Sequence, residues 1–269
     1  MEGPADMQQS DIVAEKGSAL RGKVAAVTGG GSGVGKAMSE LFAKNGCSVL
    51  VVDVVPARVE EVVGKIKSGG GKATGLVSDL TDPQEPEKMV DHALSQFGSV
   101  DILCNNAGIM DGVVPAAEAT DELWNRVMAV NLTAPFKASR KVIPHMIKQG
   151  GGVILNTASV AGIFGGMAGV SYTVSKHALI GLTRSIAAQY GKSGIRCNAM
   201  VLGGVNTNIG LGSAQPDKAG LEHLMKLAAL VPRMAEPMEI AELAFFLVSS
   251  KSSYINGSCV VIDGGWTVF

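Results

Sequence analysis

The sequence predicts one α/β domain, in which a doubly wound, seven-stranded parallel β-sheet is flanked by helices on both faces. Short apolar runs rich in β-branched residues, such as "KVAAVT" at 23–28 and "CSVLVVDV" at 47–54, are typical of strands buried on both faces. These runs alternate with amphipathic helical windows, and repeated β-α-β units form parallel sheets with right-handed crossovers. The chain has 269 residues, of which 46% are hydrophobic, so it can build one large core.

The other elements follow in order along the chain. An apolar stripe predicts a helix at 34–46, which stops at Asn45-Gly46, and the same pattern recurs at 56–70 and 82–98. A leucine stripe predicts a further helix at 218–230. The remaining expected strands are residues 72–79, which is the weakest, 100–108, 151–159, 195–204 and 257–265.

The domain is expected to span residues 21–269, because no linker or change of composition interrupts the alternation after residue 21. Residues 1–20 are acidic and contain no apolar segment, so they resemble neither a secretory signal nor a transit peptide. They are expected to form a flexible N-terminal tail. The chain carries no internal repeat.

Composition excludes several classes of protein. The net charge of -1 gives no sign of a nucleic-acid or anionic-membrane surface. The longest apolar runs have about seven residues, far fewer than a membrane span needs. None of the four cysteines forms a C-x-x-C pair, which favours buried free thiols in a reducing compartment over a zinc site. A cytoplasmic protein with no metal, no nucleic-acid partner and no membrane partner is expected. The cysteines are Cys47, Cys104, Cys197 and Cys259.

A glycine-rich loop, "TGGGSGVGKA" at 28–37, joins the first strand to the first helix. Its glycines permit a tight turn and close backbone approach, and the helix N-terminus offers free N–H groups to a pyrophosphate. A simple strand-to-helix turn would not need so many glycines. The loop therefore predicts a Rossmann-type dinucleotide site. The expected contacts are Gly29, Ser32, Gly33, Val34 and Gly35.

Asp53 ends the second strand, 18 residues after Gly35. This is the spacing of a carboxylate that binds the adenosine ribose hydroxyls, and such a carboxylate repels a 2′-phosphate. Ser32 provides no cation in the loop, and Arg58 is expected to lie in the next helix. The predicted cofactor is therefore NAD rather than NADP.

A phenol and an ammonium stand four residues apart in "SYTVSKHALI" at 171–180, where Tyr172 and Lys176 would share one helical face. One interpretation is a solvated helix with a snorkelling lysine. The other is a proton-transfer site, in which the tyrosine pKa must fall from about 10. Lys176, helped by the positive ring of bound NAD, would lower that pKa, and Ser159 would polarise the substrate oxygen.

Five motifs, in order and at matching separations, decide between these interpretations. They are "TGGGSGVG", "NNAG" at 105–108, Asn131 in "AVNLT", Ser159 in "NTASVAG", and Tyr172 with Lys176 in "YTVSK". Ser159 precedes Tyr172 by 13 residues. On these motifs residues 21–269 resemble the short-chain dehydrogenase/reductase family.

The resemblance implies catalytic roles for Asn131, Ser159, Tyr172 and Lys176. Tyr172 would be the general acid/base, Lys176 would also hold the nicotinamide ribose, and Asn131 would hold a water that links the lysine to solvent. Leu202 stands where the family usually has proline, and the missing ring could alter the loop over the nicotinamide. The further cofactor contacts implied are Asp79 with Leu80 at the adenine, Asn106, Ala107 and Gly108 beneath the ribose, and Val205 and Thr207 at the carboxamide.

Three loops are expected to select the substrate: residues 108–114, 161–170 and a lid at about 206–235. They are largely apolar, and Ile163 and Phe164 are the expected substrate contacts beside Ser159 and Tyr172. The helix at 218–230 could instead pack only through its leucine stripe. An apolar pocket would suit a secondary alcohol or its ketone.

Other substrates and roles stay open. Reductases of 3-oxoacyl-carrier-protein resemble this chain throughout, but they typically use NADP and present a basic pair, where this chain has Lys137 and Ala188. Sugar and steroid dehydrogenases of the family, and a non-catalytic dinucleotide sensor or scaffold, are further alternatives. The resemblance also implies a homotetramer or homodimer that buries helices around 120–148 and 172–191 and the apolar C-terminal end "WTVF".

Overall fold

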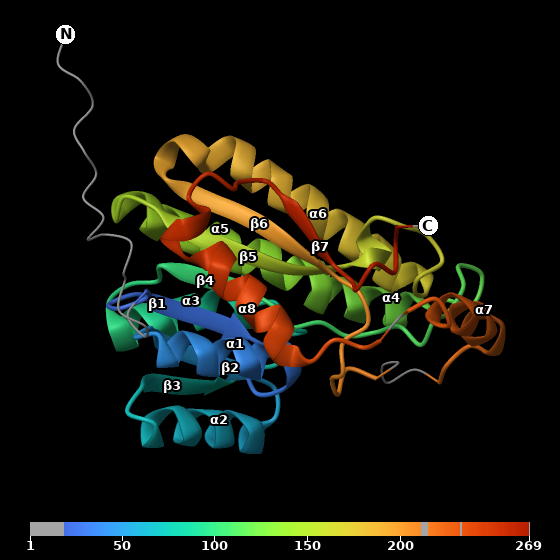
Figure 1. Ribbon diagram of the computed structural model, residues 1–269, viewed down its shortest axis with the longest axis horizontal. Coiled ribbons are helices and arrows are strands. Elements are labelled where there is room, and N and C mark those ends of the chain that lie inside the picture. Colours follow the sequence, from blue (N-terminus) through green and yellow to red (C-terminus); the bar gives the residue numbers. More distant parts are fainter. Residues whose placement is uncertain (1–18, 211–214, 232, 269) are drawn as a thin grey trace, which may run out of the picture.

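A computed structural model describes residues 19–210, 215–231 and 233–268. Seven parallel strands form one sheet in the order β3-β2-β1-β4-β5-β6-β7, with helices on both faces (Figure 1). This confirms the predicted fold class. The strands are β1 (Val24–Thr28), β2 (Ser48–Asp53), β3 (Lys72–Val77), β4 (Ile102–Asn105), β5 (Gly152–Ser159), β6 (Ile195–Leu202) and β7 (Cys259–Ile262).

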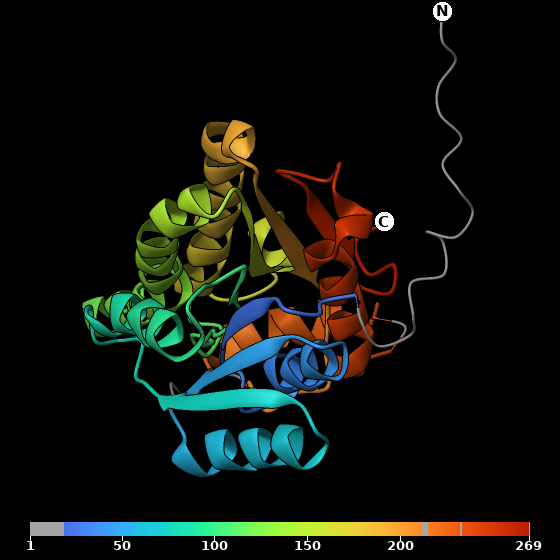
Figure 2. The same ribbon diagram turned by 90° about the vertical axis from the view of Figure 1, so that its left-hand side faces the viewer.

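Helices lie on both faces of the sheet (Figure 2). An apolar core on each face holds them to it. On one face α1, α2 and α8 cover β1 and β2, and Phe42 and Met38 of α1 are fully buried there. On the other face α3, α5 and α6 bury residues such as Met89 and Met146. The helices are α1 (Gly33–Lys44), α2 (Pro56–Ser68), α3 (Glu85–Phe97), α4 (Asp121–Met128), α5 (Ala134–Lys148), α6 (Val170–Tyr190), α7 (Lys218–Ala228) and α8 (Pro237–Val248).

The strand order reverses at β1, which lies between β2 and β4. The chain first runs outward from β1 to β3 and then returns to add β4 on the other side. Because all strands are parallel, the carboxyl ends of β1 and β4 leave a crevice between loops that diverge to opposite faces. This is where a doubly wound sheet binds its ligands, and the glycine loop and the "NNAG" segment both begin there.

Some boundaries differ from those expected from the sequence. β4 ends at Asn105, so three of the four "NNAG" residues lie in the loop after the strand. Leu20, which the sequence assigned to the tail, is only 2% exposed, and its N–H donates to the Asn45 carbonyl at 3.0 Å. The folded domain therefore includes Leu20. Residues 1–18 of the expected tail lie outside the described residues, as do 211–214 and 232 of the expected lid.

A π-helical segment, Ala129–Thr133, joins α4 to α5 inside the region expected to be helical. The wider turn of a π-helix changes the direction of side chains relative to a regular α-helix, and such segments occur often at functional sites. Here it contains Asn131, which is fully buried. The sequence pattern did not reveal this segment.

Within the described ranges, no helix is long and apolar enough to cross a membrane. The same ranges contain no group of three or more His, Cys, Asp or Glu side chains able to hold a metal ion. All four cysteines are free thiols, and all but Cys259 are buried. Burial raises the pKa of Cys47 and of Cys197 to about 12, so both stay protonated at neutral pH.

Candidate active site

The glycine loop packs directly against the segment that follows β4. A Cβ added at Gly29 would lie 3.1 Å from the Cα of Ala107, and one at Gly35 would lie only 2.1 Å from the Gly29 carbonyl oxygen. Gly29 has a φ of 63°, which a side chain would strain. A side chain at position 35 would therefore require the backbone to move, and one at position 29 would be crowded and strained.

The N-terminus of α1 follows this loop and suits an anion. Ser32 is the N-cap residue, but its side chain makes no capping hydrogen bond, and the first turn of α1 contains no acidic residue. The N–H groups of that turn thus lack a side-chain acceptor from the cap, and the helix dipole favours negative charge there. The geometry fits a pyrophosphate.

Asp53, the last residue of β2, is hydrogen-bonded beside the glycine loop. Its carboxylate accepts hydrogen bonds from the N–H of Gly31 and of Val55, both at 3.1 Å, and it is 6% exposed. A Cβ at Gly31 would lie 2.9 Å from the Asp53 carboxylate and 2.7 Å from the Cβ of Arg58. Arg58 lies in α2, the next helix, as the sequence predicts. Its Cβ also lies beside Gly31, close to the Asp53 carboxylate, which the sequence did not indicate.

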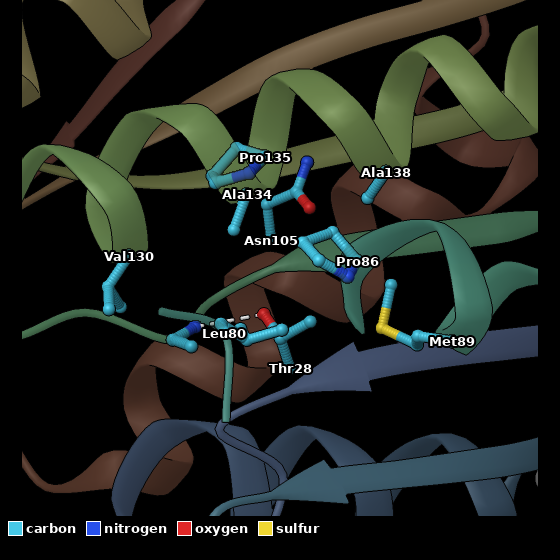
Figure 3. A pocket seen from close by; sticks show the side chains of 10 residues that line it. Thr28, Leu80, Pro86, Met89, Asn105, Val130, Ala134, Pro135 and Ala138 are labelled. Atoms are coloured by element: carbon cyan, nitrogen blue, oxygen red, sulfur yellow. Dashed lines mark hydrogen bonds between the residues drawn. The ribbon is translucent and has the colours of Figure 1, made fainter. Parts of the chain in front are cut away.

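The segment after β4 is fixed by Thr28 at the end of β1. The Thr28 hydroxyl accepts from the N–H of Asn106 and of Ala107, both at 3.0 Å, and Asn106 Nδ2 donates to the Thr28 carbonyl. The same segment lines an apolar pocket together with Leu80 and Met89 (Figure 3). The pocket has no interior room even for a water molecule, so it is not a site for a dinucleotide.

Asp79, the other expected adenine contact, is exposed just before Leu80. Its Oδ1 accepts hydrogen bonds from the N–H and the hydroxyl of Thr81, at 2.9 and 2.8 Å. The carboxylate thereby shapes the turn after β3, at the same edge of the sheet as Asp53.

Two of the four predicted catalytic side chains, Lys176 and Asn131, meet at Gly108, and Tyr172 lies beside Lys176. A Cβ at position 108 would lie 3.3 Å from Lys176 Nζ and 3.4 Å from Asn131 Oδ1. Lys176 Nζ donates to the Thr157 carbonyl at 2.8 Å and lies 5.4 Å from the centre of the Tyr172 ring. Tyr172 is 8% exposed and Lys176 only 2% exposed, which excludes a solvated helix with a snorkelling lysine.

Asn131 ties the loop after β4 to α6. Its Oδ1 accepts from the Ile109 N–H at 2.9 Å, and its Nδ2 donates to the Ile109 carbonyl and to the Ser175 hydroxyl. Ser175 in turn donates to the Tyr172 carbonyl at 2.7 Å. Asn131 therefore holds the backbone on both sides of the site.

Ser159 ends β5 and faces Tyr172. Its Oγ accepts from the Ala161 N–H at 3.2 Å, in the 3₁₀ turn Val160–Gly162. Its side chain also forms a hydrogen bond with the Tyr172 phenol, which lowers the pKa of that phenol. A hydroxyl in contact with the phenol can also reach the same substrate oxygen.

The overall pKa shift of Tyr172 is opposite to the one expected from the sequence. Burial, its largest cause, raises the pKa of Tyr172 to about 12, and the negative charge of Asp111 raises it further, against the Ser159 hydrogen bond. Burial also lowers the pKa of Lys176 to about 8. The reason is desolvation, which penalises both charged forms, and residue spacing does not reveal it.

The residues expected at the carboxamide, Val205 and Thr207, contact neighbouring segments. Thr207 lies against the glycine loop, since a Cβ at Gly33 would be 3.0 Å from its Cγ2. Val205 forms a parallel bridge with Ala235. Leu202, which replaces the family proline, is 8% exposed and is the last paired residue of β6, opposite Ser159 and Ile262. Leu202 is therefore held in the sheet by pairing with a strand on each side.

The two expected substrate contacts point different ways. Ile163 packs into a small core with Leu227 of α7 and Trp266, whereas Phe164 is 41% exposed. Trp266, which the sequence analysis places against another subunit, is already only 8% exposed in the single chain, and its Nε1 donates to the Leu227 carbonyl at 2.9 Å. The C-terminal segment thus holds α7 within the same chain.

Sequence reasoning missed one residue, Asp111. It is fully buried and accepts backbone hydrogen bonds at the start of α6, including one from the Tyr172 N–H. The available signal was a single acidic residue in the otherwise apolar segment "GIMDGVV". Sequence alone could not show which backbone groups it meets.

Comparisons with known proteins agree with this geometry. A family model described as short chain dehydrogenase matches residues 23–217. The 3beta-hydroxysteroid dehydrogenase 2 of Eggerthella lenta is 40% identical over 251 residues, which are 93% of this chain and 96% of that protein.

Two solved structures are also similar. A 7 alpha-hydroxysteroid dehydrogenase complexed with NADH and 7-oxo glycochenodeoxycholic acid is 34% identical, with a TM-score of 0.82 over 93% of this chain and 97% of that one. A Beutenbergia cavernae protein with bound NADP is 36% identical, with a TM-score of 0.83 over 93% and 98%. With the family model covering most of the chain, this protein belongs to the short-chain dehydrogenase family.

Proposed function

We propose that this protein is an NAD-dependent oxidoreductase that interconverts a secondary alcohol and its ketone, with Tyr172 as general acid/base. The observation that carries the proposal is one buried cluster: Lys176 and Asn131 meet at Gly108, the Tyr172 ring centre lies 5.4 Å from Lys176 Nζ, and Ser159 is hydrogen-bonded to the phenol. The glycine loop opens into the same crevice. A site with these four side chains beside a dinucleotide cradle fits alcohol oxidation.

The residues present fit a dinucleotide, which would supply the oxidant of the reaction when bound. Gly29 and Gly35 keep the loop free of side chains, and the first turn of α1 would meet the pyrophosphate. Asp53 would accept hydrogen bonds from the adenosine ribose, and its charge favours NAD over NADP. Lys176 would donate to the nicotinamide ribose from its place beside Thr157.

In alcohol oxidation Tyr172 would remove the hydroxyl proton, and Ser159 would donate a hydrogen bond to the same substrate oxygen. A phenol with a pKa raised to about 12 is a poor base at neutral pH. The ammonium of Lys176, 5.4 Å from the ring centre, stabilises the phenolate, and a positive nicotinamide adds to this effect. Asn131 would hold the water that returns the proton to solvent.

The proposed substrate is a secondary alcohol on an alicyclic ring, of the kind found in steroids. The loops around Ile163 and Leu227 present apolar side chains, and the hydroxysteroid dehydrogenases described above act on such rings. A carrier-protein substrate is less well supported. Lys137, its expected basic contact, donates to the Pro83 carbonyl at 2.7 Å, and Ala188 stands at the other position.

The first experiment is a substrate panel. Purified protein is mixed with NAD, and separately with NADP, and with cyclic alcohols, hydroxysteroids, sugars or 3-hydroxyacyl thioesters, while the absorbance of reduced nicotinamide is followed. We expect turnover with NAD on the cyclic alcohols. Tight NAD binding without turnover in either direction would favour the sensor or scaffold alternative, and turnover confined to thioesters would favour the carrier-protein reductase.

The preference for NAD over NADP can be tested by substituting Asp53. Asp53→Asn keeps the size of the side chain and removes its charge. We expect the ratio of kcat/KM with NAD to that with NADP to fall about tenfold or more, because a charge 4 Å away is worth about 1–4 kcal/mol.

The neighbouring cation provides the control for that measurement. Adding Arg58→Ala to Asp53→Asn should reduce the gained use of NADP, since the stem of Arg58 lies against Gly31. If Asp53→Asn leaves the ratio unchanged, the carboxylate does not set the preference.

We also propose that the protein acts in the cytoplasm as a homotetramer or homodimer. Apolar side chains are exposed on the helices expected at the interface, such as Phe136 of α5 (44%) and Val174 of α6 (37%), and on β7, where Val261 is 45% exposed. Sedimentation velocity should show a species of two or four chains at micromolar concentration. A monomer across that range would remove the proposal.

A further inference from the structure

The carboxylate of Asp111 is buried in the interior of the protein, where acidic side chains are rare. It is 0% exposed, and among the residues described no lysine, arginine or histidine forms a salt bridge with it. Its Oδ1 accepts from the N–H of Val113 and of Gly169, both at 3.2 Å, and its Oδ2 accepts from the Tyr172 N–H at 2.9 Å. Backbone N–H groups therefore compensate a buried charge, which is otherwise costly.

Two of these N–H groups, those of Gly169 and Tyr172, belong to the start of α6. Gly169 is the N-cap residue of that helix and has no side chain with which to cap it. Asp111 supplies the missing acceptor from a distant loop, and its negative charge faces the positive end of the helix dipole. A Cβ at position 169 would lie 2.5 Å from both carboxylate oxygens, so the glycine makes room for this contact.

The residues after Asp111 also form a hydrogen bond at the start of α7, the helix inside the expected lid, which we call the lid helix. We call residues 111–114 the strap. The Val114 carbonyl accepts from the Val170 N–H at 3.0 Å, and the Gly112 carbonyl accepts from the N–H of Asp217, the N-cap residue of α7, at 2.9 Å. Val113 has a φ of 58°, a strained value for a β-branched residue. The strap thus contacts the first turn of α6 and the first turn of α7 at once.

We propose that Asp111 is a positioning residue of the active site, which caps α6, fixes the backbone of Tyr172 and joins it through the strap to the lid helix α7. This inference rests on the proposed function, because it gives Tyr172 the role of acid/base. It assigns to the strap a task that packing alone does not require, which is to hold a negative charge near the phenol with backbone N–H groups as its partners.

The electrostatic part of the proposal gives it a specific signature. The negative charge of Asp111 disfavours the phenolate of Tyr172, in opposition to Lys176 on the same helix. The other groups that face this region are the hydroxyl of Ser159, the amide of Asn131 in the π-helical segment, and His223 of α7, whose Nε2 lies 2.8 Å from the place of a Cβ at Gly166. The charged residues of α4, which packs on α6, are exposed: Asp121, Glu122 and Arg126.

The test is Asp111→Asn, measured by the pH dependence of kcat for alcohol oxidation, dinucleotide affinity and melting temperature. Because the phenolate becomes easier to form, we expect the midpoint of the pH profile to move to lower pH. The new side-chain NH₂ group would face a backbone N–H that now donates to a carboxylate oxygen, so one hydrogen bond that positions Tyr172 is lost. We therefore expect kcat at its plateau to fall about tenfold or more. Dinucleotide affinity should stay within about twofold, because none of the hydrogen bonds of Asp111 described above involves the glycine loop or the first turn of α1, where the dinucleotide is proposed to bind.

Asp101→Asn is the matched control. Asp101 also accepts a backbone hydrogen bond, from the Val24 N–H at 2.9 Å, but it lies at the opposite end of β4 from the site. It should lower the melting temperature without moving the pH midpoint. If Asp111→Asn behaves like Asp101→Asn, with an unchanged midpoint and kcat, the proposal is overturned.

Two further measurements keep the outcomes separate. If Asp111→Asn does not fold, Gly169→Ala displaces the carboxylate while keeping its charge, and a wild-type kcat in that variant would overturn the proposal. If the wild type turns over no substrate, the proposed function fails, and tyrosinate absorbance then reports on Asp111. The chain has only three tyrosines, so subtracting the titration of Tyr172→Phe isolates Tyr172, whose midpoint should fall in Asp111→Asn. An unchanged midpoint there would also overturn it.

Discussion

Replacing Tyr172 by Phe should lower kcat by about two to four orders of magnitude, the usual contribution of a general acid/base. The substitution keeps the buried ring and removes only the hydroxyl, which is hydrogen-bonded to Ser159. The contacts of the glycine loop do not involve this ring, so NAD affinity should change little. Steady-state kinetics and fluorescence titration with reduced cofactor measure the two quantities separately.

Tyr190→Phe is the control for that variant. Tyr190 is the last residue of the same helix α6 and packs against the core at the far end of the sheet. It should retain the wild-type kcat, although its melting temperature can shift. If Tyr172→Phe turns over substrate as fast as Tyr190→Phe does, Tyr172 is not the acid/base.

Replacing Gly35 by Ala should abolish measurable dinucleotide binding and destabilise the fold. The new Cβ would lie 2.1 Å from the Gly29 carbonyl oxygen and 2.7 Å from Asn106 Nδ2. Overpacking of a core costs about 1–3 kcal/mol, and here the obstacle is backbone that cannot rotate away. Either the glycine loop or the segment after β4 must move, and both line the proposed dinucleotide site. Chemical denaturation and cofactor titration give the two effects.

Gly64→Ala separates this steric effect from the general effect of a glycine substitution. Gly64 lies inside α2, and a Cβ there would meet nothing within 4 Å. Because glycine inside a helix is entropically unfavourable, this variant should gain about 0.5–1 kcal/mol of stability and bind cofactor normally. Normal cofactor binding by Gly35→Ala would contradict the close packing at the loop.

The sequence by itself determined the fold and most of the candidate site. Strand and helix periodicities follow local rules, so the order of elements and the seven-stranded sheet could be read from them. The glycine loop and Asp53 are close in sequence to the elements that position them. Tyr172 and Lys176 are four residues apart on one helix, and this spacing alone places them on one face.

The tertiary structure alone decided how those side chains are solvated and held. Burial sets the pKa of Tyr172 and of Lys176, and it depends on packing from segments far away in the chain. Asp111 reaches α6 across a separation of 61 residues from Tyr172, and Trp266 reaches α7 across 39. Hydrogen bonds between such distant residues leave no periodic trace in the sequence, because only the folded chain brings the two partners within bonding distance.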